Sequence, residues 1–264
     1  MYIKDIVLRT HDLEAYNISL SGDVVIPGFV TERQTGDLCR IIALSESLFK
    51  KNADITSVTI PPTVKHIGPQ TFYDCVCLTQ VKLPDTVESI GSGAFYNCEQ
   101  LRCINLPEKL TEIAYRTFDG CTSLTNVKIP SSVIRIGSEA FEACVNLRSI
   151  VLPERLQGIM EYAFCGCRQL QDITVPASVK ELREHTFSNC DSLRLVTLKE
   201  GLLDIQSGVF SYCTSLEKVH IPETVNTVDP YAFAGCNNLS IIEIPVKLQP
   251  NLKVFASHSR IVYY

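Results

Sequence analysis

Cysteine has the widest chemical repertoire of the residue types in this sequence, and 12 of the 264 residues are cysteines. Their thiols can form disulfides, hold zinc or act as nucleophiles. Zinc sites usually draw on pairs spaced as Cys-x-x-Cys, whereas this chain has only Cys75-x-Cys77 and Cys165-x-Cys167. The histidines are scattered, at His11, His66, His185, His220 and His258. We therefore expect no metal site, and no motif indicates a cofactor.

Eight of the cysteines recur at a constant interval of 23 residues. They are Cys75, Cys98, Cys121, Cys144, Cys167, Cys190, Cys213 and Cys236. Each follows a phenylalanine by three residues, and nine phenylalanines keep the same interval. These are Phe49, Phe72, Phe95, Phe118, Phe141, Phe164, Phe187, Phe210 and Phe233. Most of the thiols therefore belong to an internal repeat.

Other apolar residues share the interval, and one unit reads Leu-x-x-Val-x-Leu-Pro-x-x-Val-x-x-Ile-Gly-x-x-Ala-Phe-x-x-Cys. The alternating apolar residues at its start predict a short strand, which proline ends because it has no N–H to donate. So short a unit cannot bury a core alone, so the units must stack, each strand pairing with the same strand one coil along. Glycines such as Gly68, Gly91 and Gly137 are expected to permit a sharp turn. Residues 92–96 are expected to form a helical or 3₁₀ turn that points phenylalanine inward.

The repeat resembles the BspA-type class of leucine-rich repeats, known from bacterial surface antigens. The phrases LTQVKLPDTVESIGSGAFYNC and LEKVHIPETVNTVDPYAFAGC carry the resemblance, which covers about residues 49–245. It implies an α/β fold, namely a right-handed solenoid or horseshoe. A parallel sheet would line the concave side, and short strands or 3₁₀ and helical turns the convex side. It also implies a surface or secreted protein of a bacterium or protist that engages host or neighbouring-cell proteins.

The chain divides into three parts within one domain. Residues 1–48 are expected to form an N-terminal cap and a first half-coil, with residues 22–27 as the half-coil and about 28–40 as an insertion. Residues 49–245 form about nine 23-residue coils, and residues 246–264 form a C-terminal cap. The irregular apolar tail, with Leu248, Leu252, Val254 and Phe255, is alternatively a recognition or dimer segment.

The repeating cysteines are interpreted as small apolar side chains packed in a tight turn. Cys103 should face outward on a strand, where a reactive thiol is the one enzymatic alternative. We find no metalloprotease, phosphate-binding, serine-hydrolase or dinucleotide motif. Glu139 and Glu142 are interpreted as solvated charges on the convex face. The sequence therefore predicts a protein that is not an enzyme.

A solenoid binds through the positions that its repeat leaves free. On the predicted strands these positions carry small polar residues, several cations and two apolar residues. The candidate partner-binding residues are Lys82, Arg102, Lys128, Arg148, Val151, Arg194, Leu195 and Lys218. Such a surface suits a protein or polysaccharide better than a small molecule, and arginine and apolar side chains are the usual hot spots. The alternative interpretation is that these are simply soluble strand residues.

Net charge and hydropathy limit the partners. The net charge of −5 and the isoelectric point near 5.6 argue against nucleic acid. No apolar run is long enough to insert into a membrane, and the N-terminus does not resemble a signal peptide. We predict a non-catalytic protein-binding module, favoured as a monomer, of the cell-surface or secreted adhesin type. The alternative is an intracellular protein-interaction scaffold in the cytoplasm, where many unpaired thiols would stay reduced.

Overall fold

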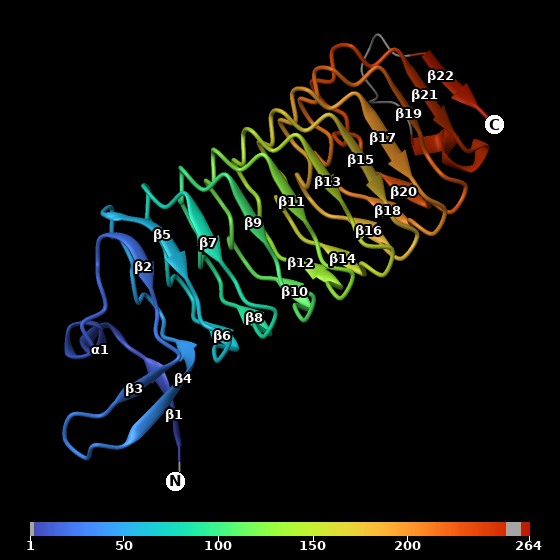
Figure 1. Ribbon diagram of the computed structural model, residues 1–264. Coiled ribbons are helices and arrows are strands. Elements are labelled where there is room, and N and C mark those ends of the chain that lie inside the picture. Colours follow the sequence, from blue (N-terminus) through green and yellow to red (C-terminus); the bar gives the residue numbers. More distant parts are fainter. Residues whose placement is uncertain (1–2, 252–259) are drawn as a thin grey trace.

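The computed structural model describes residues 3–251 and 260–264. About nine coils are stacked along one axis, as Figure 1 shows, and each coil contributes one strand to each of two parallel sheets. The parallel-strand solenoid expected from the repeat is therefore confirmed.

Helix is scarce in the part of the chain that is described, which corrects the helical content expected of an α/β fold. Its one α-helix is α1 (Thr10–Ala15), and a 3₁₀ helix, η1 (Val246–Asn251), follows the last coil. Around Phe95 the backbone makes successive turns, in which Ala94 N–H donates to Gly91 C=O and Tyr96 N–H donates to Gly93 C=O. No described helix is long and apolar enough to cross a membrane.

The longer strands of the coils form what we call the major sheet. They are β2 (Gly22–Val25), β5 (Ile55–Thr59), β7 (Gln80–Lys82), β9 (Cys103–Asn105), β11 (Asn126–Lys128), β13 (Ser149–Val151), β15 (Asp172–Val175), β17 (Leu195–Leu198), β19 (Lys218–His220) and β21 (Ile241–Ile244). Equivalent residues of successive coils pair, as Ser57 does with Gln80 and Gln80 with Cys103. The hydrogen-bonded ladder runs from β2 to β13, from β15 to β17 and from β19 to β21, with interruptions between β13 and β15 and between β17 and β19.

The minor sheet lies on the return path of each coil, and all its strands except the seven-residue β4 have two residues. They are β4 (Leu38–Leu44), β6 (His66–Ile67), β8 (Ser89–Ile90), β10 (Glu112–Ile113), β12 (Arg135–Ile136), β14 (Gly158–Ile159), β16 (Glu181–Leu182), β18 (Asp204–Ile205) and β20 (Thr227–Val228). In each of these two-residue strands the second residue is buried, so the minor sheet closes the core opposite the major sheet.

Additional strands lie at both ends of the stack (Figure 1). At the N-terminal end β1 (Lys4–Leu8) pairs parallel with β4, and β3 (Phe29–Thr31) pairs antiparallel with β4. At the other end β22 (Arg260–Tyr263) pairs parallel with β21. Leu248 is buried, whereas Leu252, Val254 and Phe255 of the expected tail lie outside the described residues.

The repeating phenylalanines form a continuous aromatic stack through the core. All nine are buried, and the rings of adjacent coils lie nearly parallel, with centroids 5.3–5.6 Å apart. This distance falls within the range of favourable aromatic pairs. The stack joins adjacent coils, because the ring of each coil stacks on that of the next coil.

The repeating cysteines do more than fill space. Each thiol donates a hydrogen bond to the carbonyl oxygen of the phenylalanine in the preceding coil, as Cys144 does to Phe118 at 3.1 Å. All eight repeat this bond, with sulfur–oxygen distances of 2.9–3.4 Å. Cysteine suits the position because it is small, apolar and a weak donor.

The turn-permitting role expected of Gly68, Gly91 and Gly137 was wrong. None of the three has a positive φ. A Cβ at Gly91 would instead lie 2.5 Å from the backbone nitrogen of Pro69, and one at Gly68 would lie 2.6 Å from that of Glu46. These glycines are needed because the backbone of the preceding coil approaches them closely.

Candidate functional site

The outer face of the major sheet presents the side chains that the repeat leaves free. Along each strand the residue facing the core is buried and its neighbours are exposed, for example Gln80 and Lys82 around Val81. The candidate residues Lys82, Arg102, Lys128, Arg148, Val151, Arg194, Leu195 and Lys218 are all exposed. Val151 and Leu195 stand out as apolar, with 78% and 60% of their surfaces exposed.

Charge is unevenly distributed along this face. Lys128 pairs with Glu108 at 3.0 Å, which lowers the pKa of that carboxyl, and Lys218 pairs with Glu243. The other four cations of the candidate set make no ion pair with any described residue. They are Lys82, Arg102, Arg148 and Arg194. From β5 to β13 no strand residue is acidic, so this half of the face is basic although the whole protein is acidic.

Two grooves cross the face where the hydrogen-bonded ladder is interrupted. One, of about 260 Å³, lies between β13 and β15 and is lined by Val151, Asp172 and Thr174 among others. The second, of about 420 Å³, lies between β17 and β19 and is lined by Arg194 and Leu195 among others. Val151 and Leu195 therefore each stand beside a groove, whereas the exposed Val25 on β2 lines neither.

The thiols divide into buried and accessible groups, and all twelve cysteines are free. Burial raises the pKa of Cys75 to about 12, so the repeating thiols stay protonated. Cys103 is exposed on β9, as expected, and Cys77 is exposed as well. Gln80 and Asn126 flank Cys103 in the sheet register, and neither side chain can act as a base.

Thiol labelling should separate these two groups. In the folded protein we expect an alkylating reagent to modify Cys77 and Cys103 rapidly, with the eight repeating cysteines reacting only after unfolding, because the thiolate attacks and burial suppresses it. Peptide mass spectrometry after a short exposure measures the difference. Rapid labelling of Cys121 or Cys144 would contradict the packing of the core.

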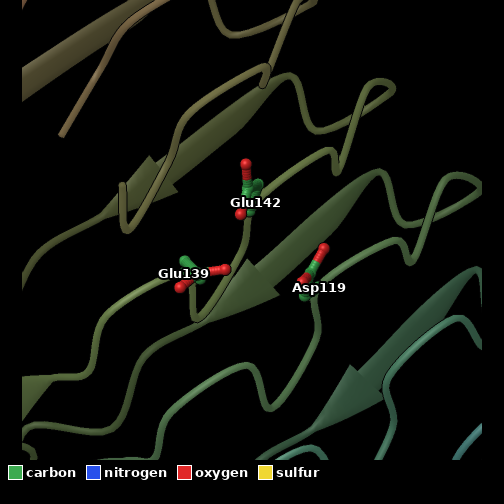
Figure 2. Close-up of side chains that lie close together, drawn as sticks. All are labelled: Asp119, Glu139 and Glu142. Carbon is green, nitrogen blue, oxygen red and sulfur yellow. The ribbon is translucent and has the colours of Figure 1, made fainter. Parts of the chain in front are cut away.

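An acidic trio was missed at the turn beside the aromatic stack. Asp119, Glu139 and Glu142 place carboxylate oxygens within 4.8 Å of one another, and Figure 2 shows the three side chains gathered on neighbouring turns. Asp119 is buried, and both glutamates are half-buried. The interpretation of Glu139 and Glu142 as solvated charges was therefore wrong.

The surroundings of the trio favour protonation. Burial raises the pKa of Asp119 to about 6, an effect that Glu139 reinforces and Arg116 opposes. Burial, together with Glu139 and Asp119, raises the pKa of Glu142 to about 7. Since three carboxyl groups share one small site, they cannot all ionise without mutual repulsion.

Three carboxylates could hold a hard cation, but Arg116 already occupies this role. Its Nε donates to Glu139 at 2.6 Å and lies 3.5 Å from a carboxylate oxygen of Asp119. The guanidinium thus supplies the positive charge that a metal ion would bring. We assign the trio a structural role, with Arg116 as its counter-ion.

The trio should make stability depend on pH. Between the ordinary carboxyl values of 3.8 and 4.5 and the raised values of about 6 and 7, the folded state binds more protons than the unfolded state. Stability from these two groups is therefore fully present below about pH 4 and falls as pH rises through 7. In urea titrations across this range, Asp119→Asn/Glu142→Gln should lose the decline. Parallel curves for the two proteins would show that the carboxyls are not perturbed.

The signal that could have revealed the trio is the repeat interval itself. Asp119 and Glu142 are 23 residues apart, so stacking places one above the other. Each follows its phenylalanine directly, a position that carries Tyr73 and Tyr96 in earlier coils. Asp119 and Glu142 belong to different coils, so their proximity is not visible within either coil alone.

The described geometry matches a known repeat family. The model of the BspA-type leucine-rich repeat region matches six copies, over residues 42–170 and 134–261. These two ranges together cover most of the chain. Repeats of this family generally serve as non-catalytic protein-interaction modules.

Several solved structures share the fold. A leucine-rich cell surface protein from Faecalibacterium prausnitzii superposes with a TM-score of 0.64 at 24% identity, covering 92% of this chain and 87% of that one. The Treponema pallidum leucine-rich repeat protein gives 0.50 at 25% identity, with 75% and 79% covered. The pneumococcal vaccine antigen PcpA gives 0.56 at 15% identity, with 92% and 89% covered.

A comparison with curated proteins found no significant match. The family assignment therefore rests on the repeat model, on the 23-residue spacing and on the parallel-strand coils observed in the structure. The chain belongs to the BspA-type leucine-rich repeat family.

Proposed function

We propose that the protein is a non-catalytic protein-binding module that engages its partner through the outer face of the major sheet. One observation carries the proposal: this face exposes four cations that make no ion pair with any described residue, together with Val151 and Leu195. Unpaired arginines and exposed apolar side chains are the groups that gain most when a partner removes them from water. The candidate residues from Lys82 to Lys218 are proposed to form this interface.

We also propose a shape for the solenoid and a division of the chain into two caps and a central repeat region. We take it to be right-handed and curved as a horseshoe, with the major sheet on its concave side. Residues 1–48 serve as the N-terminal cap, 49–245 as the binding solenoid and 246–264 as the C-terminal cap. A concave sheet lets several coils contact one partner at once, which an interface of ordinary size requires.

The favoured biological role is a cell-surface or secreted adhesin type, and it rests on the character of the family. The second candidate is an intracellular scaffold. Twelve free thiols favour this second role, because a reducing compartment keeps such thiols unpaired.

The test is affinity capture with three immobilised proteins. These are the wild type, a face variant (Arg102→Glu/Arg148→Glu/Arg194→Glu) and a control variant. Lys65→Glu/Lys109→Glu/Arg168→Glu is the matched control, since its cations are exposed outside the candidate set and make ion pairs with Glu88 and Asp191. Both variants change the net charge equally.

Proteins bound by the wild type and the control, but lost from the face variant, would support the proposal. Capture from extracellular matrix and serum proteins would indicate the adhesin role, and capture from cytosol of the producing cell would indicate the scaffold. Equal capture by all three proteins would rule out the face as the binding site.

A further inference from the structure

The major sheet carries two interruptions, and both coincide with features of its outer face. The ladder stops between β13 and β15 and again between β17 and β19. Figure 1 shows these four strands in order along the solenoid. A groove opens at each interruption. Val151, at the end of β13, and Leu195, at the start of β17, are the apolar side chains at these positions.

The distance between the two grooves limits which backbone conformation a bound segment can have. The two grooves are two coils apart, which corresponds to roughly 10 Å along the solenoid axis at the usual spacing of parallel strands. Leu195 also lies two residues nearer the start of its strand than Val151, whose equivalent in that coil is Thr197. In a polyproline-type extended segment every third side chain points the same way, with a repeat of about 9 Å. In a flat β-strand the side chains on one face repeat at about 7 Å, so two consecutive side chains of that face would not reach both grooves.

The cations on the β7 to β13 side of the first groove indicate the rest of the segment, whereas the charged residues that line the groove itself are Glu154 and Asp172. On the N-terminal side of Val151 lie Arg148, Arg102 and Lys82, none of which makes an ion pair with a described residue, together with Lys128. Arg194 lines the second groove, and it likewise makes no ion pair with a described residue. A partner with carboxylates would neutralise these cations, whereas a basic partner would be repelled.

We infer that the face binds an extended acidic protein segment whose two apolar side chains, three residues apart, occupy the grooves beside Val151 and Leu195. Its acidic flank lies over β7 to β13. This inference rests on the proposed function, because it specifies the partner of the same face. The apolar side chains supply anchoring, and the carboxylates supply orientation and rapid association.

The probe is a short fluorescein-labelled peptide with a glutamate-rich flank followed by Leu-x-x-Leu, and binding is measured by fluorescence anisotropy. Three comparison peptides change one feature each: Leu-x-Leu spacing, serine in place of both leucines, and a lysine-rich flank. Oligothymidylate of similar charge tests for simple polyanion binding. We expect the Leu-x-x-Leu peptide to bind at least about ten times more tightly than each comparison probe, with an affinity that falls as salt rises.

Two variants locate the site. Leu195→Ser should weaken the Leu-x-x-Leu peptide about tenfold and leave the serine-substituted peptide unchanged, because only the anchor is lost. Tyr231→Ser removes an apolar side chain of similar exposure that lines neither groove, and it should change nothing. Circular dichroism confirms that both variants fold.

Equal affinity for Leu-x-Leu and Leu-x-x-Leu, or for oligothymidylate, would overturn the inference. These results would leave the proposed function standing if natural proteins are still captured through the face. If the face variant captures the same proteins as the wild type, the proposed function itself is overturned.

Discussion

Phe141→Ala should lower the free energy of unfolding by roughly 3–5 kcal/mol, the range measured for deleting a buried aromatic ring. The ring of Phe141 is fully buried and stacks between those of Phe118 and Phe164, with both centroid distances at 5.3 Å. Its removal leaves a cavity in the middle of the stack, and neighbouring coils cannot close it without breaking their own hydrogen bonds. Denaturant titration followed by circular dichroism measures the loss.

The control for this prediction is Tyr231→Ala. Tyr231 is also aromatic, but 62% of its surface is exposed. Its replacement should change stability by no more than about 0.5 kcal/mol, as is usual for surface substitutions. An unchanged denaturation midpoint for Phe141→Ala would contradict the role of the aromatic stack in joining the coils.

Gly91→Ala should destabilise the protein by roughly 1–3 kcal/mol, the usual cost of overpacking. The new Cβ would lie 2.5 Å from the backbone nitrogen of Pro69 and 2.8 Å from the carbonyl carbon of Gly68. Both atoms are backbone of the preceding coil, so the two coils must move apart. The same denaturant titration tests the expectation.

Gly158→Ala is the matched control, and it should have the opposite sign or no effect. Like Gly91, Gly158 has no positive φ, but its added Cβ would meet only the terminal methyl of Met160, at 2.7 Å. That flexible side chain can move, and replacing glycine in such a position restricts the unfolded chain. Equal destabilisation by both substitutions would show that coil contact does not explain the need for glycine.

The repeat interval made much of the fold predictable. In a stacked solenoid, residues 23 positions apart become neighbours, so the buried phenylalanines and cysteines followed from the sequence. The outward positions followed from strand alternation, and Val151, Leu195 and Cys103 are exposed as expected. These predictions needed only the periodicity of the apolar residues, which can be read directly from the sequence.

Other features depend on the distance between adjacent coils, which periodicity leaves unspecified. The contact of Gly91 with Pro69 reflects close coils, and the grooves beside Val151 and Leu195 reflect places where the ladder is interrupted. The acidic trio depends in addition on how deeply Asp119 is buried at its turn. Burial and coil spacing are properties of packing, so they become visible only in three dimensions.

Binding through the outer face of the major sheet is tested most directly by a lysine footprint of the protein with a captured partner. Acetylation rates are compared in the free and bound states by mass spectrometry. We expect the partner to protect Lys82 and Lys128, on the outer face of the major sheet, while Lys65 and Lys109, which pair with Glu88, keep their rates. Protection of Lys65 and Lys109 with unchanged rates at Lys82 and Lys128 would contradict binding through this face.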